Sequence, residues 1–133
     1  MTLFPYLAVP LLLVAGAANA QHGAHDAVVE SLMTKALADY PGKDAQVITV
    51  TYPPGAVDPV HRYNAHSFVY VLEGSIIMGV RGGKPITLTA GQTFYEGPDD
   101  VHTIGRNASQ TKPAKFLVVL LKNHDDPILI PTE

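Results

Sequence analysis

The sequence predicts an all-β fold of the sandwich or barrel type. Eleven Gly and eleven Pro are spread along the 133 residues and divide the chain into short segments, which is typical of strands joined by turns. Between these turn residues lie runs of β-branched and aromatic residues in which apolar and polar positions alternate, as they do in half-buried strands. Strands that recur at this spacing favour a sandwich or barrel over alternating βαβ units.

The composition indicates a single globular domain that does not bind nucleic acid. The chain is 47% hydrophobic, which is enough apolar content to bury a core. Nine Lys and Arg stand against twelve Asp and Glu, and no basic run is present to track a phosphate backbone. The absence of cysteine excludes disulfides, thiolate metal sites and thiol nucleophiles.

Residues 1–20 have the pattern of an export signal. Residues 3–18 are apolar or small, and Ala18-Asn19-Ala20 forms a small-x-small pattern directly before Gln21. The apolar stretch contains two prolines and is shorter than the ~20 residues of a membrane-spanning helix. We therefore expect cleavage near Ala20 and Gln21 and a mature protein that is periplasmic or secreted, with no membrane segment.

Residues 21–45 form an N-terminal segment with two possible conformations. Its second half, residues 26–37, carries apolar side chains at a spacing that fits one face of a short helix. The same stretch could equally be extended and lead into the first strand.

Residues 46–123 contain most of the predicted strands. The run VITVTY is β-branched and alternates, and turn signals such as Pro53-Pro54-Gly55 and Gly97-Pro98 separate the runs. The expected strands are residues 47–52, 67–72, 75–80, 86–89, 92–95, 102–105 and 115–122, with a short last strand at 128–130 within the C-terminal tail, residues 124–133.

Histidines are the residues most suited to chemistry, because no nucleophile elbow, phosphate loop or H-E-x-x-H motif is present. His61 and His66 lie in the run that leads into one predicted strand, and His102 follows a turn about forty residues later. Neutral imidazoles from two strands could converge on a first-row transition metal, which one side chain alone cannot hold. His61, His66 and His102 are therefore the candidate metal ligands, with a structural or surface role as the alternative.

The spacing around His61 resembles the first motif of the cupin family. That motif asks for Gly, five residues, His-x-His, three or four residues, Glu, six residues and Gly. Gly55 leads by five residues to His61, Tyr63 stands at the second His, Ser67 at the Glu, and Gly74 follows six residues later. The sequence YVLEG that ends at Gly74 is very similar to the corresponding strand and turn of the family.

The spacing around His102 resembles the second cupin motif. Gly91 leads by five residues to Gly97, and His102 keeps its register, with Asn107 one place late. The stretches HRYNAHSFVYVLEGSI and AGQTFYEGPDDVHTIGRNAS are similar to a group of small exported cupins. In that group the first motif usually reads H-R-H-N-A-H.

The resemblance implies a double-stranded β-helix, or jelly-roll barrel, with a divalent transition metal such as Mn, Fe, Ni, Cu or Zn in its pocket. Cupins hold such ions with three His and one carboxylate, so Tyr63 and Ser67 replace two of the expected ligands. His66 could fill one vacancy if a bulge turned it inward, although strict strand alternation from His61 would point it outward. Tyr63 is interpreted as a hydrogen-bond donor or pocket wall in preference to a ligand. Glu96 could orient an imidazole or act as a base, or it could be a solvated turn residue.

Two functions follow from this pattern. The first is a metal-dependent enzyme that acts on a small organic substrate, with dioxygenase chemistry ahead of isomerase or decarboxylase chemistry. Its metal would be held by His61, His66 and His102, with Tyr63 and Glu96 assisting. The second is a non-catalytic small-molecule-binding module with a degenerate metal site. A homodimer is a further possibility that the sequence does not specify.

Overall fold

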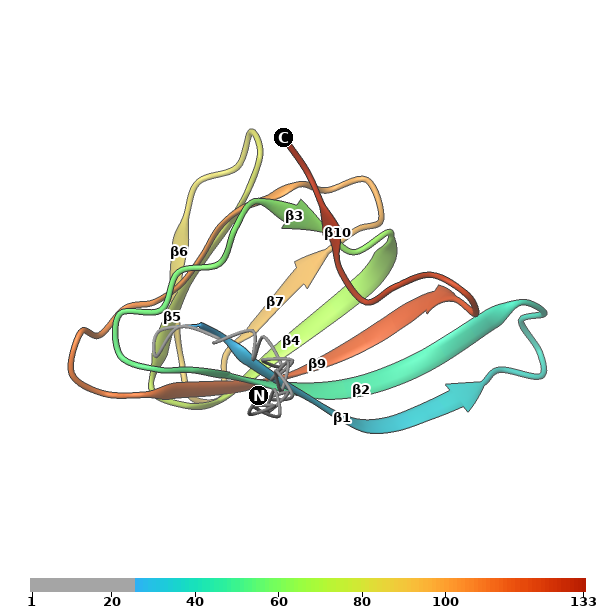
Figure 1. The fold of residues 1–133 in the computed structure, drawn as a ribbon, viewed down its shortest axis with the longest axis horizontal. Helices are drawn as coiled ribbons and strands as arrows, with labels where there is room; N and C mark the ends of the chain where they lie inside the picture. The colour runs from blue at the N-terminus through green and yellow to red at the C-terminus, as the bar shows by residue number, and fades with distance from the viewer. Residues whose placement is uncertain (1–25) are drawn as a thin grey trace, which may run out of the picture.

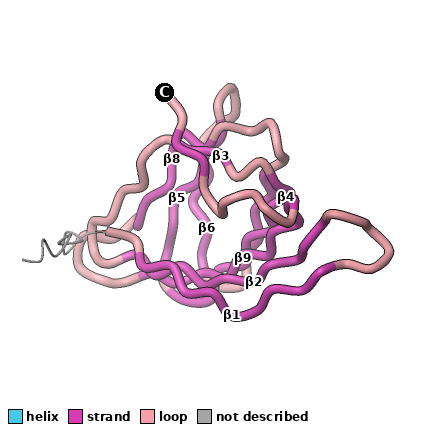
Figure 2. Tube along the Cα trace, turned by 45° about the vertical axis from the view of Figure 1, so that its right-hand side comes forward, coloured by secondary structure: helices cyan, strands magenta, loops and turns pink. Residues whose placement is uncertain are grey.

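The computed structural model describes residues 26–133, which form two facing antiparallel sheets of five strands each (Figure 1). This described part contains strands, turns and loops and no helix (Figure 2), so it holds no helix that could cross a membrane. The expected export signal lies outside the described residues.

The larger sheet has the strand order β1-β2-β9-β4-β7. Its longest pairing joins β2 to β9 over ten register pairs, from Lys43↔Asn123 to Tyr52↔Ala114. The strands are β1 (Val28–Ala36), β2 (Lys43–Tyr52), β9 (Ala114–Asn123), β4 (Ala65–Glu73) and β7 (Thr93–Glu96).

The smaller sheet has the order β10-β3-β8-β5-β6 and closes the barrel over the larger one. Its strand β3 contains two residues and is paired with β10 on one side and β8 on the other. The strands are β10 (Ile130–Pro131), β3 (His61–Arg62), β8 (His102–Asn107), β5 (Ser75–Val80) and β6 (Ile86–Thr89).

Strict alternation along the strands fills the space between the sheets. In β4 and β9 every second side chain is buried, beginning with Ala65 and Ala114. The aromatic rings of Tyr52 and Phe116 meet edge to face at a centroid distance of 5.0 Å. Each large aliphatic or aromatic side chain buried in this way contributes about 1.5–3 kcal/mol relative to exposure. The buried hydrophobic residues are Ile48, Val50, Tyr52, Ala56, Ala65, Val69, Val71, Ile76, Met78, Leu88, Ala114, Phe116, Val118 and Leu120.

The predicted all-β jelly-roll barrel is confirmed. Of the two conformations left open for the N-terminal segment, the extended one is correct, because β1 pairs with β2 along almost its whole length. The helical spacing of its apolar residues has no counterpart in packing, since all nine residues of β1 are exposed. A bulge between Ser31 and Met33 breaks its alternation.

The turn between β4 and β5 requires a glycine at position 74. Gly74 has φ of 73°, and a Cβ there would lie 2.5 Å from the carbonyl oxygen of Pro113. Only glycine tolerates both the left-handed conformation and the close approach. The motif glycine therefore brings the β4–β5 turn against the start of β9.

Asn107 ties three loops together at one end of the barrel. Its Nδ2 group lies within hydrogen-bonding distance of the carbonyl oxygens of Tyr52 (3.2 Å), Pro53 (3.0 Å) and Lys112 (2.7 Å). Its Oδ1 accepts a hydrogen bond from the Ser109 amide at 2.9 Å. Because the side chain is 1% exposed, water cannot replace these partners.

We predict that Asn107→Ala lowers the free energy of unfolding by about 2–4 kcal/mol, since it leaves several buried carbonyl groups without their hydrogen-bond donor. Asn123→Ala is the matched control. The Asn123 side chain also forms hydrogen bonds, but it is less deeply buried, so its loss should cost less than about 1 kcal/mol. Urea unfolding of both variants measures the difference, and equal destabilisation would contradict the role given to Asn107.

Candidate functional site

His61 and His102 face each other across the smaller sheet. They are register partners in the β3–β8 pairing, so their side chains leave the same face of the sheet. Their rings are 4.7 Å apart between centroids, and the residues are 0% and 3% exposed. The structure thus brings two of the three predicted histidines together inside the barrel.

His61 is held with one ring nitrogen available. Its Nδ1 lies 2.8 Å from the carbonyl oxygen of Pro59, and a carbonyl can only accept, so Nδ1 carries the proton. Its Nε2 is buried and has no hydrogen-bond partner among the described residues. A neutral imidazole in this tautomer presents the Nε2 lone pair to a ligand or proton.

Both ring nitrogens of His102 are engaged. Nδ1 lies 2.8 Å from Oε1 of Glu96, and Nε2 donates to the carbonyl of Ile104. Burial alone would lower the pKa of His102, but the Glu96 carboxylate and the Ile104 carbonyl raise it above its ordinary value. The Glu96 carboxylate therefore stabilises the protonated form of His102 against the cost of its burial.

Glu96 lies inside the barrel, not in solvent. It pairs with Ser67 across the β4–β7 ladder, and both residues are buried, at 2% and 0% exposure. Asp100 accepts a hydrogen bond from the Gly97 amide at 2.6 Å and thereby closes the turn between Glu96 and His102. The Ser67 hydroxyl and Oε2 of Glu96 have no hydrogen-bond partner in the described part of the chain. A carboxylate thus lies directly across the ladder from the position where the cupin motif has its Glu.

Asp58 is a site residue that the sequence analysis missed. The Tyr52 hydroxyl donates to its Oδ2. Burial raises the pKa of Asp58, and the Tyr52 hydrogen bond, His61 and His102 offset part of this rise. Burial and the neighbouring Asp58 carboxylate also raise the pKa of Tyr52, which keeps it a phenol donor.

Gly105 allows Asp58 to approach His102. A Cβ at position 105 would lie 2.7 Å from Nε2 of His102 and 3.1 Å from Oδ2 of Asp58. The Asp58 amide donates to the Gly105 carbonyl at 2.8 Å, which fixes this segment beside β8. This long-range pairing gives no local pattern, so no spacing in the sequence pointed to Asp58.

Tyr63 lies beside His61, with the rings in an edge-to-face arrangement at 5.1 Å. It packs partly buried against the core. Burial, with the nearby Glu96 and Asp58 carboxylates, raises the pKa of Tyr63, so its side chain is an uncharged phenol. Such a phenol can donate a hydrogen bond.

His66 lies on the outer face of β4, and the expectation that it joins His61 and His102 is wrong. Alternation places Ala65 and Ser67 inward and His66 outward. Its Nδ1 is 2.8 Å from the Tyr95 hydroxyl, and both residues are exposed. The pairing of β4 with β9 is regular from residue 65 to residue 71, without a bulge. The side chain of His66 therefore keeps its outward direction.

Within residues 26–133 no group of three or more His, Asp or Glu side chains is arranged to hold a metal ion. Two imidazoles and two carboxylates nevertheless converge in one buried region. These four residues are His61, His102, Asp58 and Glu96.

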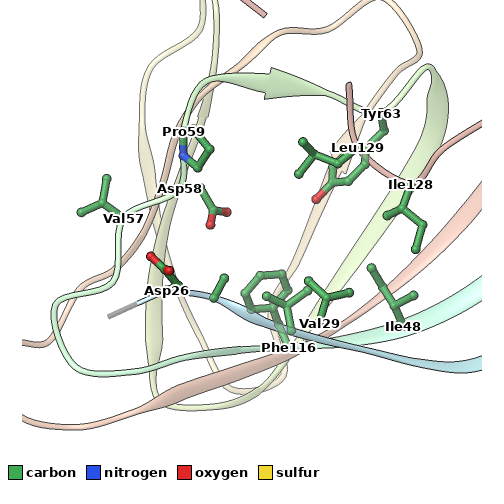
Figure 3. Close-up of a pocket in the computed structure, with 12 residues that line it drawn as sticks. Asp26, Val29, Ile48, Val57, Asp58, Pro59, Tyr63, Phe116, Ile128 and Leu129 are labelled. Atoms are coloured by element: carbon green, nitrogen blue, oxygen red, sulfur yellow. The ribbon is translucent and has the colours of Figure 1, made fainter. Parts of the chain in front are cut away.

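A cavity of about 490 Å³ adjoins this cluster between the two sheets. The Asp58 carboxylate and the Tyr63 hydroxyl both point into it from its polar side (Figure 3). Most of the remaining wall is apolar and comes from β1, β2, β9 and the segment before β10, including Val29, Ile48 and Phe116. The volume falls in the range of about 300–1,000 Å³ that small-molecule sites occupy.

Comparison with known proteins identifies the fold. An uncharacterized conserved protein with a double-stranded β-helix domain from Klebsiella pneumoniae aligns with a TM-score of 0.64 at 16% identity, over 86% of this chain and 90% of its own. An oxalate oxidase aligns with a TM-score of 0.61 at 22% identity, over 90% and 61%. The DMSP lyase DddQ from Ruegeria pomeroyi aligns with a TM-score of 0.58 at 20% identity, over 66% and 43%. No curated protein sequence matches the chain.

These solved structures are less than 25% identical to the chain and show its fold alone. The chain spans 43% of the lyase and 61% of the oxidase. The family model for the cupin domain matches residues 48–120, which is more than half of the sequence and contains His61, Glu96 and His102. The chain belongs to the cupin family.

Proposed function

We propose that this cupin is a metal-dependent enzyme that acts on a small organic molecule, with dioxygenase-type cleavage as its reaction. His61 and His102 are the imidazole ligands of a divalent transition metal, and Asp58 supplies a carboxylate. The observation that carries the proposal is the anchoring of both Nδ1 atoms, at 2.8 Å from the Pro59 carbonyl and at 2.8 Å from Glu96.

The donor chemistry fits a first-row transition metal. Imidazoles that ligate metals usually donate their second ring N–H to a carbonyl or carboxylate, and Nδ1 of each histidine has such a partner here. Nε2 of His61 is buried and has no hydrogen-bond partner within residues 26–133, which is costly unless a ligand occupies it. To bind a metal, Nε2 of His102 would have to lose its proton and its hydrogen bond to the Ile104 carbonyl. Burial raises the pKa of Asp58, and a cation between the imidazoles would favour its ionised form.

Two histidines and one carboxylate are the ligand set of many oxygen-activating iron enzymes, and such a centre supplies Lewis-acid and one-electron chemistry with open positions for substrate. The chain's own residues position the reactants. Glu96 holds the orientation of His102, and Tyr63 presents a neutral hydroxyl to the cavity. The apolar wall excludes water from the bound molecule.

A second candidate function is binding without catalysis. The observation in its favour is that the Ile104 carbonyl already engages Nε2 of His102. Tyr63 and Ser67 also replace two ligands of the usual cupin set. In that case the cavity holds a small molecule and the Glu96–His102 pair is purely structural.

The metal site is tested by titrating chelator-treated protein, purified without a His tag, with Mn, Fe, Ni, Cu and Zn. We expect one equivalent of at least one ion to bind and His61→Ala to weaken that binding at least about 100-fold, because it removes a ligand. His66→Ala is the matched control, since His66 lies on the outer face. Calorimetry and elemental analysis give the affinity and stoichiometry. Binding that is absent, or weakened equally by both variants, favours the non-catalytic function.

The position of Tyr63 gives a second prediction. Tyr63→His restores the imidazole that the family motif has there and should tighten metal binding by about 10-fold or more, since a further nitrogen donor joins the set. Tyr63→Phe should leave the affinity within about 3-fold, because the phenol is a donor and not a ligand. The same titration measures both variants, and an unchanged affinity for Tyr63→His would place residue 63 out of reach of the ion.

A further inference from the structure

We propose that two copies of this chain associate through β1, whose outer edges pair antiparallel so that Glu30 of each copy faces Lys35 of the other. The two five-stranded sheets then join into one continuous sheet. This inference concerns the edge of the larger sheet and does not depend on the proposed function.

β1 is the edge strand of the larger sheet (Figure 1), and no strand within residues 26–133 pairs with its outer edge, the side away from β2. Natural sheets protect such an edge with a short strand, a proline or an inward-pointing charge. β1 is nine residues long and contains no proline. The side chains on its inward face are uncharged, and they are Val29, Ser31, Thr34 and Ala36. The edge is therefore suited to accept a further strand.

β1 exposes apolar side chains on both of its faces. Val28 and Met33 point outward and are 59% and 55% exposed, and Val29 points inward and is 50% exposed. Leu32, at the bulge, is 53% exposed. A partner that docked on one face of the sheet would cover only some of these side chains, whereas an added strand places its own side chains beside both faces. The exposure pattern thus favours pairing at the edge.

The bulge in β1 allows the strand to pair with a second copy of itself in a register that joins opposite charges. Glu30 and Lys35 are five residues apart and would lie on opposite faces of a regular strand. Here they pair with Thr49 and Ala45 of β2, which are four residues apart, so both point outward. Two identical antiparallel strands are related by a two-fold axis, and facing residues must share a face. With the axis at the bulge, Glu30 meets Lys35 of the second copy on the outer face.

This register is complementary along the whole strand. The interface contains the Glu30–Lys35 contact twice, since the two-fold axis repeats it, and opposite charges directly across an antiparallel pair are stabilising. The ion pairs within residues 26–133 involve neither side chain. On the inner face Ser31 meets Thr34 of the second copy. Registers centred on Glu30 or on Lys35 would instead place like charges together, which is destabilising. The charges therefore identify a second copy as the partner.

Met33→Cys tests the register directly, because the chain has no cysteine of its own. Position 33 lies beside the proposed axis, so mild oxidation should join two copies through a disulfide. Val28→Cys is the matched control, since residue 28 is similarly exposed on the same outward face. In this register its two copies are more than about 20 Å apart, too far for a disulfide. Non-reducing electrophoresis measures both variants, and no disulfide at position 33, or an equal yield at position 28, would overturn the proposal.

Charge reversal tests the pairing without a crosslink. A contact along one strand is small, so we expect the unmodified protein to dimerise with a dissociation constant in the micromolar range. Glu30→Lys places two lysines at each contact and should weaken the dimer at least about 10-fold. Adding Lys35→Glu restores opposite charges in reversed order and should recover the affinity to within about 3-fold.

Glu73→Lys is the control for the change in net charge, because Glu73 is exposed on β4 and outside the proposed interface. It should leave the affinity within about 3-fold of the unmodified protein. Sedimentation equilibrium measures all four proteins. A chain that stays monomeric at about 100 μM, a reversed pair that does not recover, or an equal loss in Glu73→Lys would contradict pairing through β1.

Discussion

The histidine site depends on a single residue pair between two neighbouring strands, β3 and β8. His61 and His102 are the single register pair that joins β3 to β8, and β3 itself is two residues long. Such a short strand is held by its neighbours, since two residues cannot fix their own conformation. On its other side β10 pairs Ile130 with Arg62 and Pro131 with His61. The two imidazoles thus lie together because β3 is held between β10 and β8.

The side chains that surround this histidine pair come from both sheets. Glu96 comes from the larger sheet and reaches His102 in the smaller one, while Asp58 comes from the segment that pairs with Gly105. The two carboxylates approach the two imidazoles from different elements, so no single strand carries the site. This arrangement gives the buried Glu96 carboxylate an imidazole partner at 2.8 Å and the buried Asp58 carboxyl group a phenol donor from Tyr52, so neither is buried without a polar partner.

The fold could be predicted from the sequence because most of the strands show alternating apolar and polar residues. Residues 47–52 and 115–122 show the period of two that β2 and β9 use to bury their inner faces. The N-terminal segment was ambiguous, because the apolar residues of β1 also fit a helical spacing, and only its pairing with β2 shows that it is extended.

The site could be predicted only in part, because pairing between strands that are distant in the sequence also decides which side chains meet there. His61 and His102 are fixed by pairing that the motif spacing reflects, whereas Asp58 takes its place through a contact with Gly105. His66 had to follow the alternation of its strand, and its sequence proximity to His61 carried no information about direction.

The two imidazoles differ in what fixes their chemistry. The tautomer of His61 is set by a main-chain carbonyl at Pro59, which is present whatever side chains surround it. The charge of His102 is set by the side chain of Glu96, which a single nucleotide change can remove or shorten. Mutation can therefore tune the basicity of one histidine and barely touch the other. A lineage carrying this barrel could therefore change the basicity of His102 by substitution at position 96 while the tautomer of His61 stays the same.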